Sequence, residues 1–153
     1  MLLTDILTPD RIKIPLRARS KDELLEELVD VVAGTAGADA HADLLRAVME
    51  REAVLSTGIG HGVAIPHGKS SAVPELRLAA GRTEVPVDYD ALDGRPVRLL
   101  FLLVGPETAA GPHIKALSRI SRILRQDAVR DALSEASDAG EFLRIVREAE
   151  ASG

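Results

Sequence analysis

The segment VRLLFLLV, residues 97–104, is the feature that most restricts the fold of this 153-residue chain. It is apolar at every position except Arg98, so both of its faces need a hydrophobic cover. Such a strand is typical of the centre of a sheet with helices on both sides. The run is too short for a membrane-spanning helix, which needs about 20 apolar residues. We therefore expect an α/β protein with a mixed β-sheet flanked by helices on both sides.

The remaining periodic segments supply the other elements of this fold. Apolar spacing and strand-forming residues predict further strands at residues 12–17 and 76–83. Helices are expected over residues 20–34, 40–52, 112–125, 128–136 and 139–149. Capping patterns support the first two, with Ser20 and Glu23 forming a capping box and Asp39 expected to cap the second. No repeat or linker divides the sequence, so residues 1–153 are expected to form a single domain.

Composition excludes several classes of function. The formal net charge is −5, and Lys and Arg are interspersed with Asp and Glu, so nucleic acid is not an expected partner. The chain has no cysteine, which rules out disulfides, thiolate metal sites and thiol nucleophiles. The N-terminal residues MLLTDILTPD carry acid where a signal peptide carries base. We expect a cytoplasmic protein that is not embedded in a membrane.

The glycine-rich segment STGIGHGVAIPHGK, residues 56–69, is the candidate site. Its glycines favour an irregular loop whose main-chain N–H groups can turn towards a bound anion. A neutral histidine is a good nucleophile, and an ordinary pKa of about 6.5 leaves much of it neutral near pH 7. The sequence therefore predicts that His67 can accept a phosphoryl group.

Two residues outside this segment are candidates for stabilising the phosphoryl charge. His113 lies near the positive end of a predicted helix, where it would tend to stay neutral and donate a hydrogen bond. Arg51, in the last turn of another predicted helix, can add a charged guanidinium group that donates paired hydrogen bonds to phosphoryl oxygens. Each has an ordinary alternative: His113 also fits a core-facing stripe, and Arg51 can simply stabilise a helix C-terminus.

Nucleotide and metal sites are the competing interpretations of these residues. A P-loop ending at Gly68-Lys69-Ser70 needs a glycine at position 63, which is valine, and the dinucleotide fingerprint fails at the same position. His61, His67 and His113 offer three nitrogen ligands for zinc, but no carboxylate follows them in a familiar spacing. A histidine metal-binding module stays a minor alternative. No metal or cofactor is expected.

Several segments together resemble the fructose, mannitol and nitrogen-type enzyme IIA family of the bacterial phosphotransferase system (PTS). They are ERE at 50–52, STGIGHGVAIPHGK at 56–69, PVDYDALDGRPVRLLFLLVGPE at 86–107 and PHIKALSRISRILR at 112–125. The resemblance covers nearly the whole chain, and AIPHGK is its most specific part. It implies a type-2 EIIA domain in which the phosphocarrier protein HPr phosphorylates Nε2 of His67. His113 matches the family's second site histidine, and Arg51 matches the arginine before the glycine-rich loop.

The resemblance leaves two partner classes open. In sugar-transporting members, it implies transfer of the phosphoryl group to a cysteine of a IIB domain, and this chain has no cysteine. A separate IIB protein or a regulatory target protein is therefore the expected partner after HPr. The layout favours a free-standing nitrogen-regulatory IIA protein, with a sugar-specific fructose or mannitol IIA component as the alternative.

Overall fold

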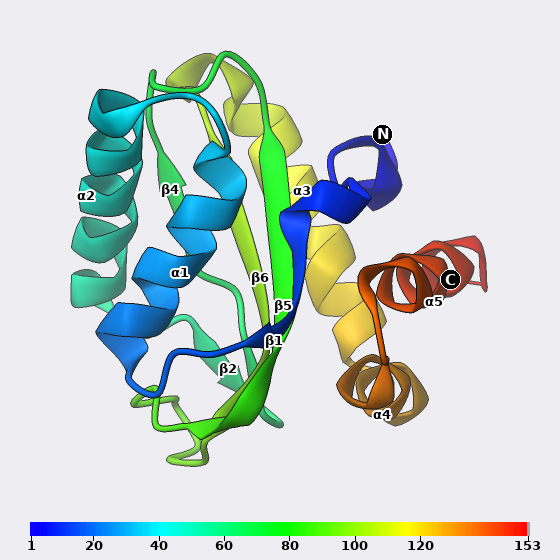
Figure 1. The fold of residues 1–153 in the computed structure, drawn as a ribbon. Coiled ribbons are helices and arrows are strands. Elements are labelled where there is room, and N and C mark those ends of the chain that lie inside the picture. The colour runs from blue at the N-terminus through cyan, green and yellow to red at the C-terminus, as the bar shows by residue number, and fades with distance from the viewer. Residues whose placement is uncertain (153) are drawn as a thin grey trace.

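The computed structural model describes residues 1–152 and contains one β-sheet with helices packed on both faces (Figure 1). The helices are α1 (Lys21–Ala33), α2 (Ala38–Val54), α3 (Ala110–Leu124), α4 (Asp127–Glu135) and α5 (Ala139–Ser152). The strands are β1 (Ile12–Leu16), β2 (Gly58–Gly60), β3 (Val63–Ala64), β4 (His67–Lys69), β5 (Arg77–Val87) and β6 (Val97–Gly105). Helices α1 and α2 cover one face, and α3, α4 and α5 cover the other (Figure 1). The predicted fold class is confirmed.

The sheet is mixed, and β6 lies at its centre. The strand order is β1-β5-β6-β3-β2, with β4 also paired to β6. Strand β6 runs antiparallel to β5 but parallel to β3 and β4, and β1 is parallel to β5. Because β3 and β4 pair with successive parts of the same strand, β6 fixes the register of His67 opposite Leu103.

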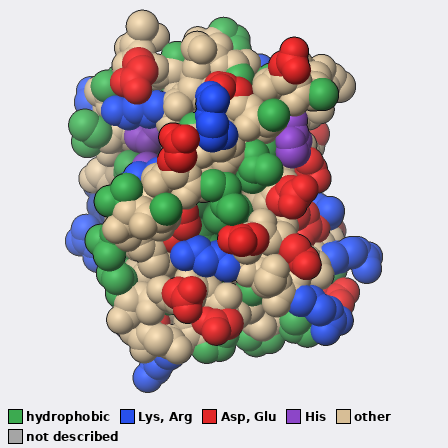
Figure 2. Space-filling model, turned by 90° about the vertical axis from the view of Figure 1, so that its left-hand side faces the viewer, with side chains coloured by type: hydrophobic (Ala, Val, Ile, Leu, Met, Phe, Trp, Pro, Cys, Tyr) green, Lys and Arg blue, Asp and Glu red, His purple; other side chains and the backbone are tan. Residues whose placement is uncertain are grey.

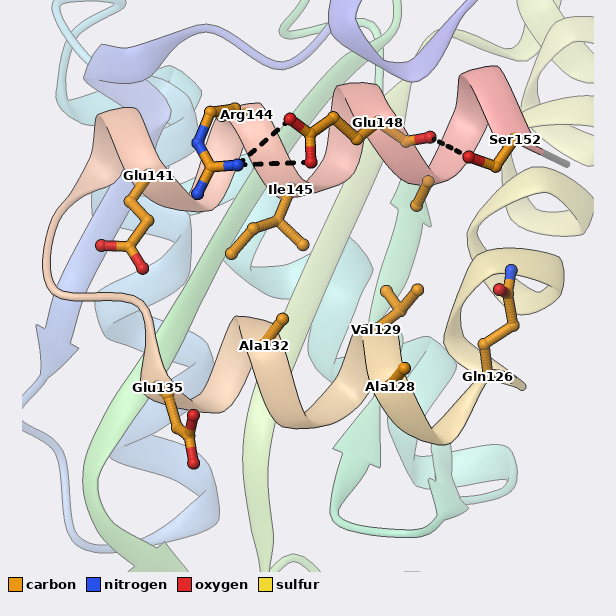
Figure 3. Close-up of a pocket in the computed structure, with 11 residues that line it drawn as sticks. Gln126, Ala128, Val129, Ala132, Glu135, Glu141, Arg144, Ile145, Glu148 and Ser152 are labelled. Atoms are coloured by element: carbon orange, nitrogen blue, oxygen red, sulfur yellow. Dashed lines mark hydrogen bonds and ion pairs between the residues drawn. The ribbon is translucent and has the colours of Figure 1, made fainter.

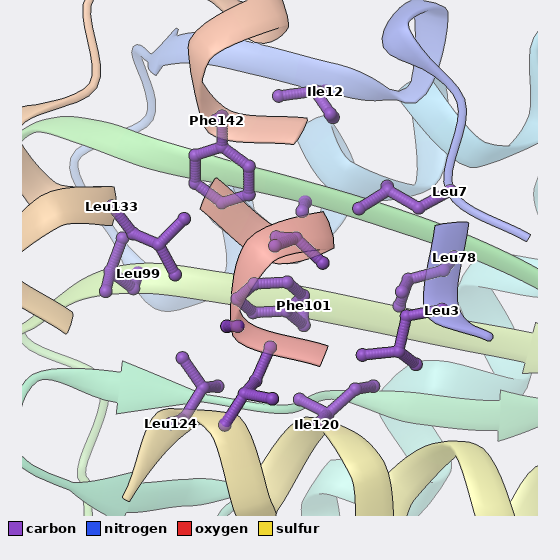
Figure 4. Close-up of a cluster of buried hydrophobic side chains, with 14 of the residues drawn as sticks. Leu3, Leu7, Ile12, Leu78, Leu99, Phe101, Ile120, Leu124, Leu133 and Phe142 are labelled. Carbon is purple, nitrogen blue, oxygen red and sulfur yellow. The ribbon is translucent and has the colours of Figure 1, made fainter. Parts of the chain in front are cut away.

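Residues of β6 alternate between two hydrophobic cores, as its uninterrupted apolar sequence predicts. Leu99, Phe101 and Leu103 belong to the core beneath α3, α4 and α5, where Phe101 packs near Phe142 (Figure 4). The residues between them point to the other core, beneath α1 and α2. The central strand therefore holds both helical layers in fixed positions relative to the strands beside it.

Helix boundaries follow local capping chemistry, with one correction. The Ser20 hydroxyl accepts a hydrogen bond from the Glu23 N–H at the start of α1, and Gly34 ends that helix at φ 55°. Asp39 does not cap α2, because the helix starts at Ala38, two residues before the predicted start, and Gly37 is its N-cap residue. Gly37 has φ 101°, a conformation that glycine adopts without strain.

The glycine-rich segment differs from the loop that its composition predicts. It forms the short hairpin β2–β3 and then β4, so most of it belongs to the sheet. Glycine is required at three positions for steric or backbone reasons. A Cβ on Gly58 would lie 2.7 Å from the Ala91 side chain, and Gly60 and Gly62 have φ of 95° and 77°, which other residues rarely adopt. The expected irregular loop is therefore largely replaced by short strands of the sheet.

The face of the molecule on which α2 lies carries side chains of both charges (Figure 2). Acidic and basic side chains alternate there with small apolar areas, and no single sign covers this face. Among residues 1–152, no helix is both long and apolar enough to cross a membrane.

Candidate functional site

A pocket of about 400 Å³ brings the predicted site residues together from three distant parts of the sequence. Helix α2 contributes Arg51, β4 contributes His67, and the first turns of α3 contribute His113. The other lining residues are Ala47, Gly68, Lys69, Ile114 and Leu117. The cavity therefore combines an apolar wall with four nitrogen-bearing side chains.

His67 is held in one ring orientation by its own main chain. Its Nδ1 lies 3.0 Å from the Ile65 carbonyl oxygen, which can only accept a hydrogen bond. Nδ1 therefore carries the proton in the neutral ring, and Nε2 carries the free lone pair. Burial lowers the pKa of His67 below its ordinary value, and the nearby Arg51 and Lys69 charges act in the same direction. The neutral, nucleophilic form of His67 is therefore favoured near pH 7.

His113 lies beside His67 and is almost completely buried. The two ring centroids are 5.7 Å apart at an interplanar angle of 67°. Burial, followed by the neighbouring His67 and Lys69, lowers the pKa of His113 to about 4. Within residues 1–152, neither of its ring nitrogens has a hydrogen-bond partner, although the side chain is only 3% exposed. A neutral ring with an unused N–H in this position can donate to an oxygen bound in the pocket.

Two cations border the same cavity. The Arg51 Nη1 donates to the Leu55 carbonyl oxygen at 3.0 Å, which anchors one side of the guanidinium while leaving other N–H groups for a ligand. Lys69 is exposed and shares a face of β4 with His67, because alternate residues of a strand point the same way. Two neutral imidazoles and two cations suit a small, multiply charged anion.

Comparison with known proteins identifies the family. The sequence matches the family "Phosphoenolpyruvate-dependent sugar phosphotransferase system, EIIA 2" over residues 5–149. The chain belongs to this EIIA family. It is 37% identical over 139 residues to a nitrogen regulatory protein of Bradyrhizobium diazoefficiens, covering 91% of this chain and 90% of that protein. The crystal structure of the nitrogen regulatory protein IIA-Ntr from Neisseria meningitidis superposes with a TM-score of 0.86 at 37% identity, covering 93% of this chain and 97% of that one.

Sugar-specific EIIA proteins are also relatives. The fructose-specific EIIABC component of Bacillus subtilis is 34% identical over 148 residues, covering 97% of this chain. The chain spans only 23% of that protein's length. The family assignment therefore supports a phosphocarrier role, while both regulatory and sugar-specific relatives exist.

Sequence reasoning did not identify Lys69 as a site residue of this EIIA chain. In the sequence, Lys69 belongs to a failed P-loop pattern and to the AIPHGK motif, and neither assigns it a role in the site. The information was present in the segment, since a strand starting at His67 places residue 69 on the same face. The segment was expected to be a loop, and in a loop alternate side chains do not share a face, so the position of Lys69 beside His67 could not be predicted from that expectation.

His61 lies apart from the EIIA pocket. It is an exposed residue at the β2–β3 turn with φ 57°, and its main-chain N–H donates to Asp93 at 3.2 Å. It is not among the residues that line the pocket with His67 and His113. Within residues 1–152, no group of three or more His, Asp or Glu side chains is placed to hold a metal ion. The three-histidine zinc site therefore does not match the geometry of these residues.

Another cavity of the EIIA chain, a groove of about 420 Å³ between α4 and α5, has a different character (Figure 3). Ala132, Val129 and Ile145 line it together with Glu135, Glu141 and Glu148. Glu148 is paired with Arg144 at 3.1 Å. The described lining of this groove contains no histidine, in contrast to the pocket that holds His67 and His113.

Proposed function

We propose that this EIIA protein is a histidine phosphocarrier that accepts a phosphoryl group from phosphorylated HPr on Nε2 of His67, and that it acts as a nitrogen-regulatory type IIA protein. The hydrogen bond between His67 Nδ1 and the Ile65 carbonyl carries this proposal. It keeps the proton on Nδ1 and leaves the Nε2 lone pair available for attack.

The transfer step needs no cofactor. The Nε2 lone pair of His67 forms the new N–P bond as the N–P bond to the donor histidine of HPr breaks, and the donor ring keeps the bonding electron pair. Negative charge on the phosphoryl oxygens is stabilised by Arg51, Lys69 and the N–H of His113. The Ile65 carbonyl stabilises the positive charge that develops on the His67 ring, because it accepts the Nδ1–H hydrogen bond.

Phosphorylation changes the surface on which a target protein would dock. A phosphoryl group adds about two negative charges to a pocket bordered by Arg51 and Lys69. It therefore neutralises a locally positive site and alters which partner surface fits there. In the regulatory role, the phosphorylated and unphosphorylated forms differ in their affinity for the target.

Intact-mass measurement tests the carrier role. The purified protein is incubated with phosphoenolpyruvate, enzyme I and HPr, and His67→Ala serves as the control variant. We expect the wild type alone to gain one phosphoryl group, which mild acid removes. If the wild type gains no mass with an HPr of demonstrated activity, the carrier role is wrong.

The sugar-specific alternative predicts a different second step, and the sugar-specific relatives are the reason to test it. Purified phosphoprotein is mixed with fructose-type and mannitol-type IIB proteins, and loss of its phosphoryl group is followed over time. Rapid discharge to a IIB cysteine would favour the sugar route. Absence of discharge, together with target binding that depends on phosphorylation, is the result expected for the regulatory role.

A further inference from the structure

Glu52 is a buried carboxylate that directly follows Arg51 in the last turn of α2. It is only 6% exposed, although ionised side chains are seldom buried without partners. Burial raises the pKa of this carboxyl, but hydrogen bonds from Thr57 and Lys21 outweigh it, so that the pKa of Glu52 lies below its ordinary value. Glu52 is therefore a fixed negative charge inside the protein, close to the phosphoryl site.

Four donors from three residues, two of them from Thr57, surround the two Glu52 oxygens. Oε2 accepts from the Thr57 N–H and from Lys21 Nζ, each at 2.9 Å. Oε1 accepts from the Tyr89 hydroxyl at 3.1 Å and from the Thr57 hydroxyl. Lys21 begins α1, Tyr89 follows β5, and Thr57 immediately precedes β2. The carboxylate therefore ties the start of the β2–β3 hairpin to two other parts of the fold.

A continuous series of hydrogen bonds leads from Glu52 to the His67 ring. Glu52 accepts from the Thr57 N–H at 2.9 Å, and the Thr57 carbonyl accepts from the Ile65 N–H at 3.0 Å. The Ile65 carbonyl then accepts from His67 Nδ1 at 3.0 Å. Thr57 precedes β2 and Ile65 follows β3, so their hydrogen bond closes the hairpin. Each hydrogen bond in this series therefore fixes the position of the group that makes the next one.

We propose that Glu52 is a positioning residue for His67. By holding Thr57, it fixes the Ile65 carbonyl where that oxygen keeps the proton on Nδ1 and leaves Nε2 as the nucleophile. Successive hydrogen bonds also polarise one another in a buried environment, which strengthens the final bond to the imidazole. The effect of Glu52 on the position and tautomer of the His67 ring is argued from these contacts alone. Its effect on phosphoryl transfer rests on the proposed function.

The charge of Glu52 acts on His67 as well. Burial, Arg51 and Lys69 all disfavour a positive imidazole, whereas Glu52 favours it. His113, the remaining titratable group beside the ring, is neutral near pH 7 because its pKa is about 4. Glu52 thus supports the imidazole at the moment when it becomes positive during attack on phosphorus.

The test is a variant that keeps the shape of Glu52 but removes its charge. In Glu52→Gln, the amide has one acceptor oxygen for the Thr57 and Tyr89 donors instead of two. Long-range ¹H–¹⁵N spectra of the labelled full-length protein report the tautomer and pKa of His67 directly. We expect wild-type His67 to be the Nδ1–H tautomer, and the variant to contain a substantial Nε2–H population with a lower His67 pKa. The single-turnover rate of phosphorylation by phospho-HPr should fall about tenfold.

Glu50→Gln is the matched control, since Glu50 is an exposed residue of the same helix, two positions away. It should keep the wild-type tautomer, pKa and transfer rate. Thr57→Val removes the hydroxyl donor and keeps the main-chain links, so a smaller shift in the same direction is expected. Should Glu52→Gln fail to fold, Thr57→Val decides the question by the same spectra.

Three results separate the possible failures. A folded Glu52→Gln protein with an unchanged His67 tautomer, pKa and transfer rate overturns the positioning role. A change in tautomer in a protein whose wild type accepts no phosphoryl group supports the positioning role and instead refutes the proposed function. A loss of thermal stability without a change in the His67 ring would assign Glu52 a purely structural role.

Discussion

His67 and His113 line the same pocket with ring centroids 5.7 Å apart, although they are separated in the sequence by two long strands. Their environments differ. His67 has a main-chain acceptor on Nδ1, whereas His113 is buried and has no partner within the described residues. His67 is therefore arranged as a nucleophile with a fixed tautomer, and His113 has an N–H group that can donate a hydrogen bond to a bound oxygen atom.

Replacement of His113 should slow transfer without preventing it. We expect His113→Ala to lower the single-turnover rate of phosphorylation by about a hundredfold, because removal of one donor to a developing negative charge has effects of this order. His113→Gln retains an N–H donor and should recover part of the rate. Rapid-quench measurements with phospho-HPr give both values.

The control for this experiment is His41→Ala, since His41 pairs with Asp30 on the surface of the α1 and α2 layer. Its rate should equal that of the wild type. Equal rates for His113→Ala and His41→Ala would show that His113 is only a core residue.

Stability should depend on pH through His113. Its pKa is about 4 in the folded protein, so the unfolded chain takes up the proton first as the pH falls through 6.5. Stability from this group is therefore fully present above pH 6.5 and is lost between pH 6.5 and 4, by up to about 3 kcal/mol. Urea unfolding across this range should show a steeper fall for the wild type than for His113→Gln. Parallel curves for the two proteins would contradict the burial of a neutral imidazole.

Arg51 should contribute its forked geometry as well as its charge. Arg51→Lys keeps the charge but loses the fixed set of donors that can hold both Leu55 and a phosphoryl oxygen. We expect about a tenfold lower rate of phosphorylation, and a larger loss for Arg51→Ala. Arg46→Lys on the same helix, where the Arg46 side chain is 66% exposed, is the control. A wild-type rate for Arg51→Lys would reduce the role of Arg51 to that of a point charge.

Gly68 should be intolerant of a side chain for steric reasons. A Cβ at this position would lie 3.1 Å from main-chain atoms of Ala47 and Val48 in α2. We expect Gly68→Ala to reduce the free energy of unfolding by about 1–3 kcal/mol and to slow phosphorylation, because β4 must move away from α2. Denaturant titration together with the transfer assay measures both effects.

Gly111→Ala provides the comparison within the same protein. Apart from its chain neighbours and the backbone of its own helix, no atom lies within 4 Å of a Cβ built on Gly111, which is in the first turn of α3. Alanine should stabilise the protein there by up to about 1 kcal/mol. Similar losses for both alanine variants would mean that backbone freedom, and not the contact with α2, explains Gly68.

The layered fold could be predicted from the sequence because its cause is local. An apolar run such as residues 97–104 requires cover on both faces wherever it lies, and amphipathic helices before and after it supply that cover. The glycine-rich segment could not be predicted in the same way. Its strands are only two or three residues long. β3 and β4 form because β6 offers them hydrogen-bonding partners, and β2 pairs in turn with β3, none of which the segment itself reveals.

The available chemistry could be predicted from the sequence: a nucleophilic histidine, a second histidine at a helix start, and an arginine before the glycines. Residue type and local spacing suffice for that. Three features depend on the folded arrangement: the free ring nitrogen of His67, the place of Lys69 but not His61 in the pocket, and the connection from Glu52 to His67 through Thr57 and Ile65. These relationships depend on hydrogen bonds between segments that come together only when β3 and β4 pair with β6. Such pairing cannot be predicted from the spacing of residues within one segment.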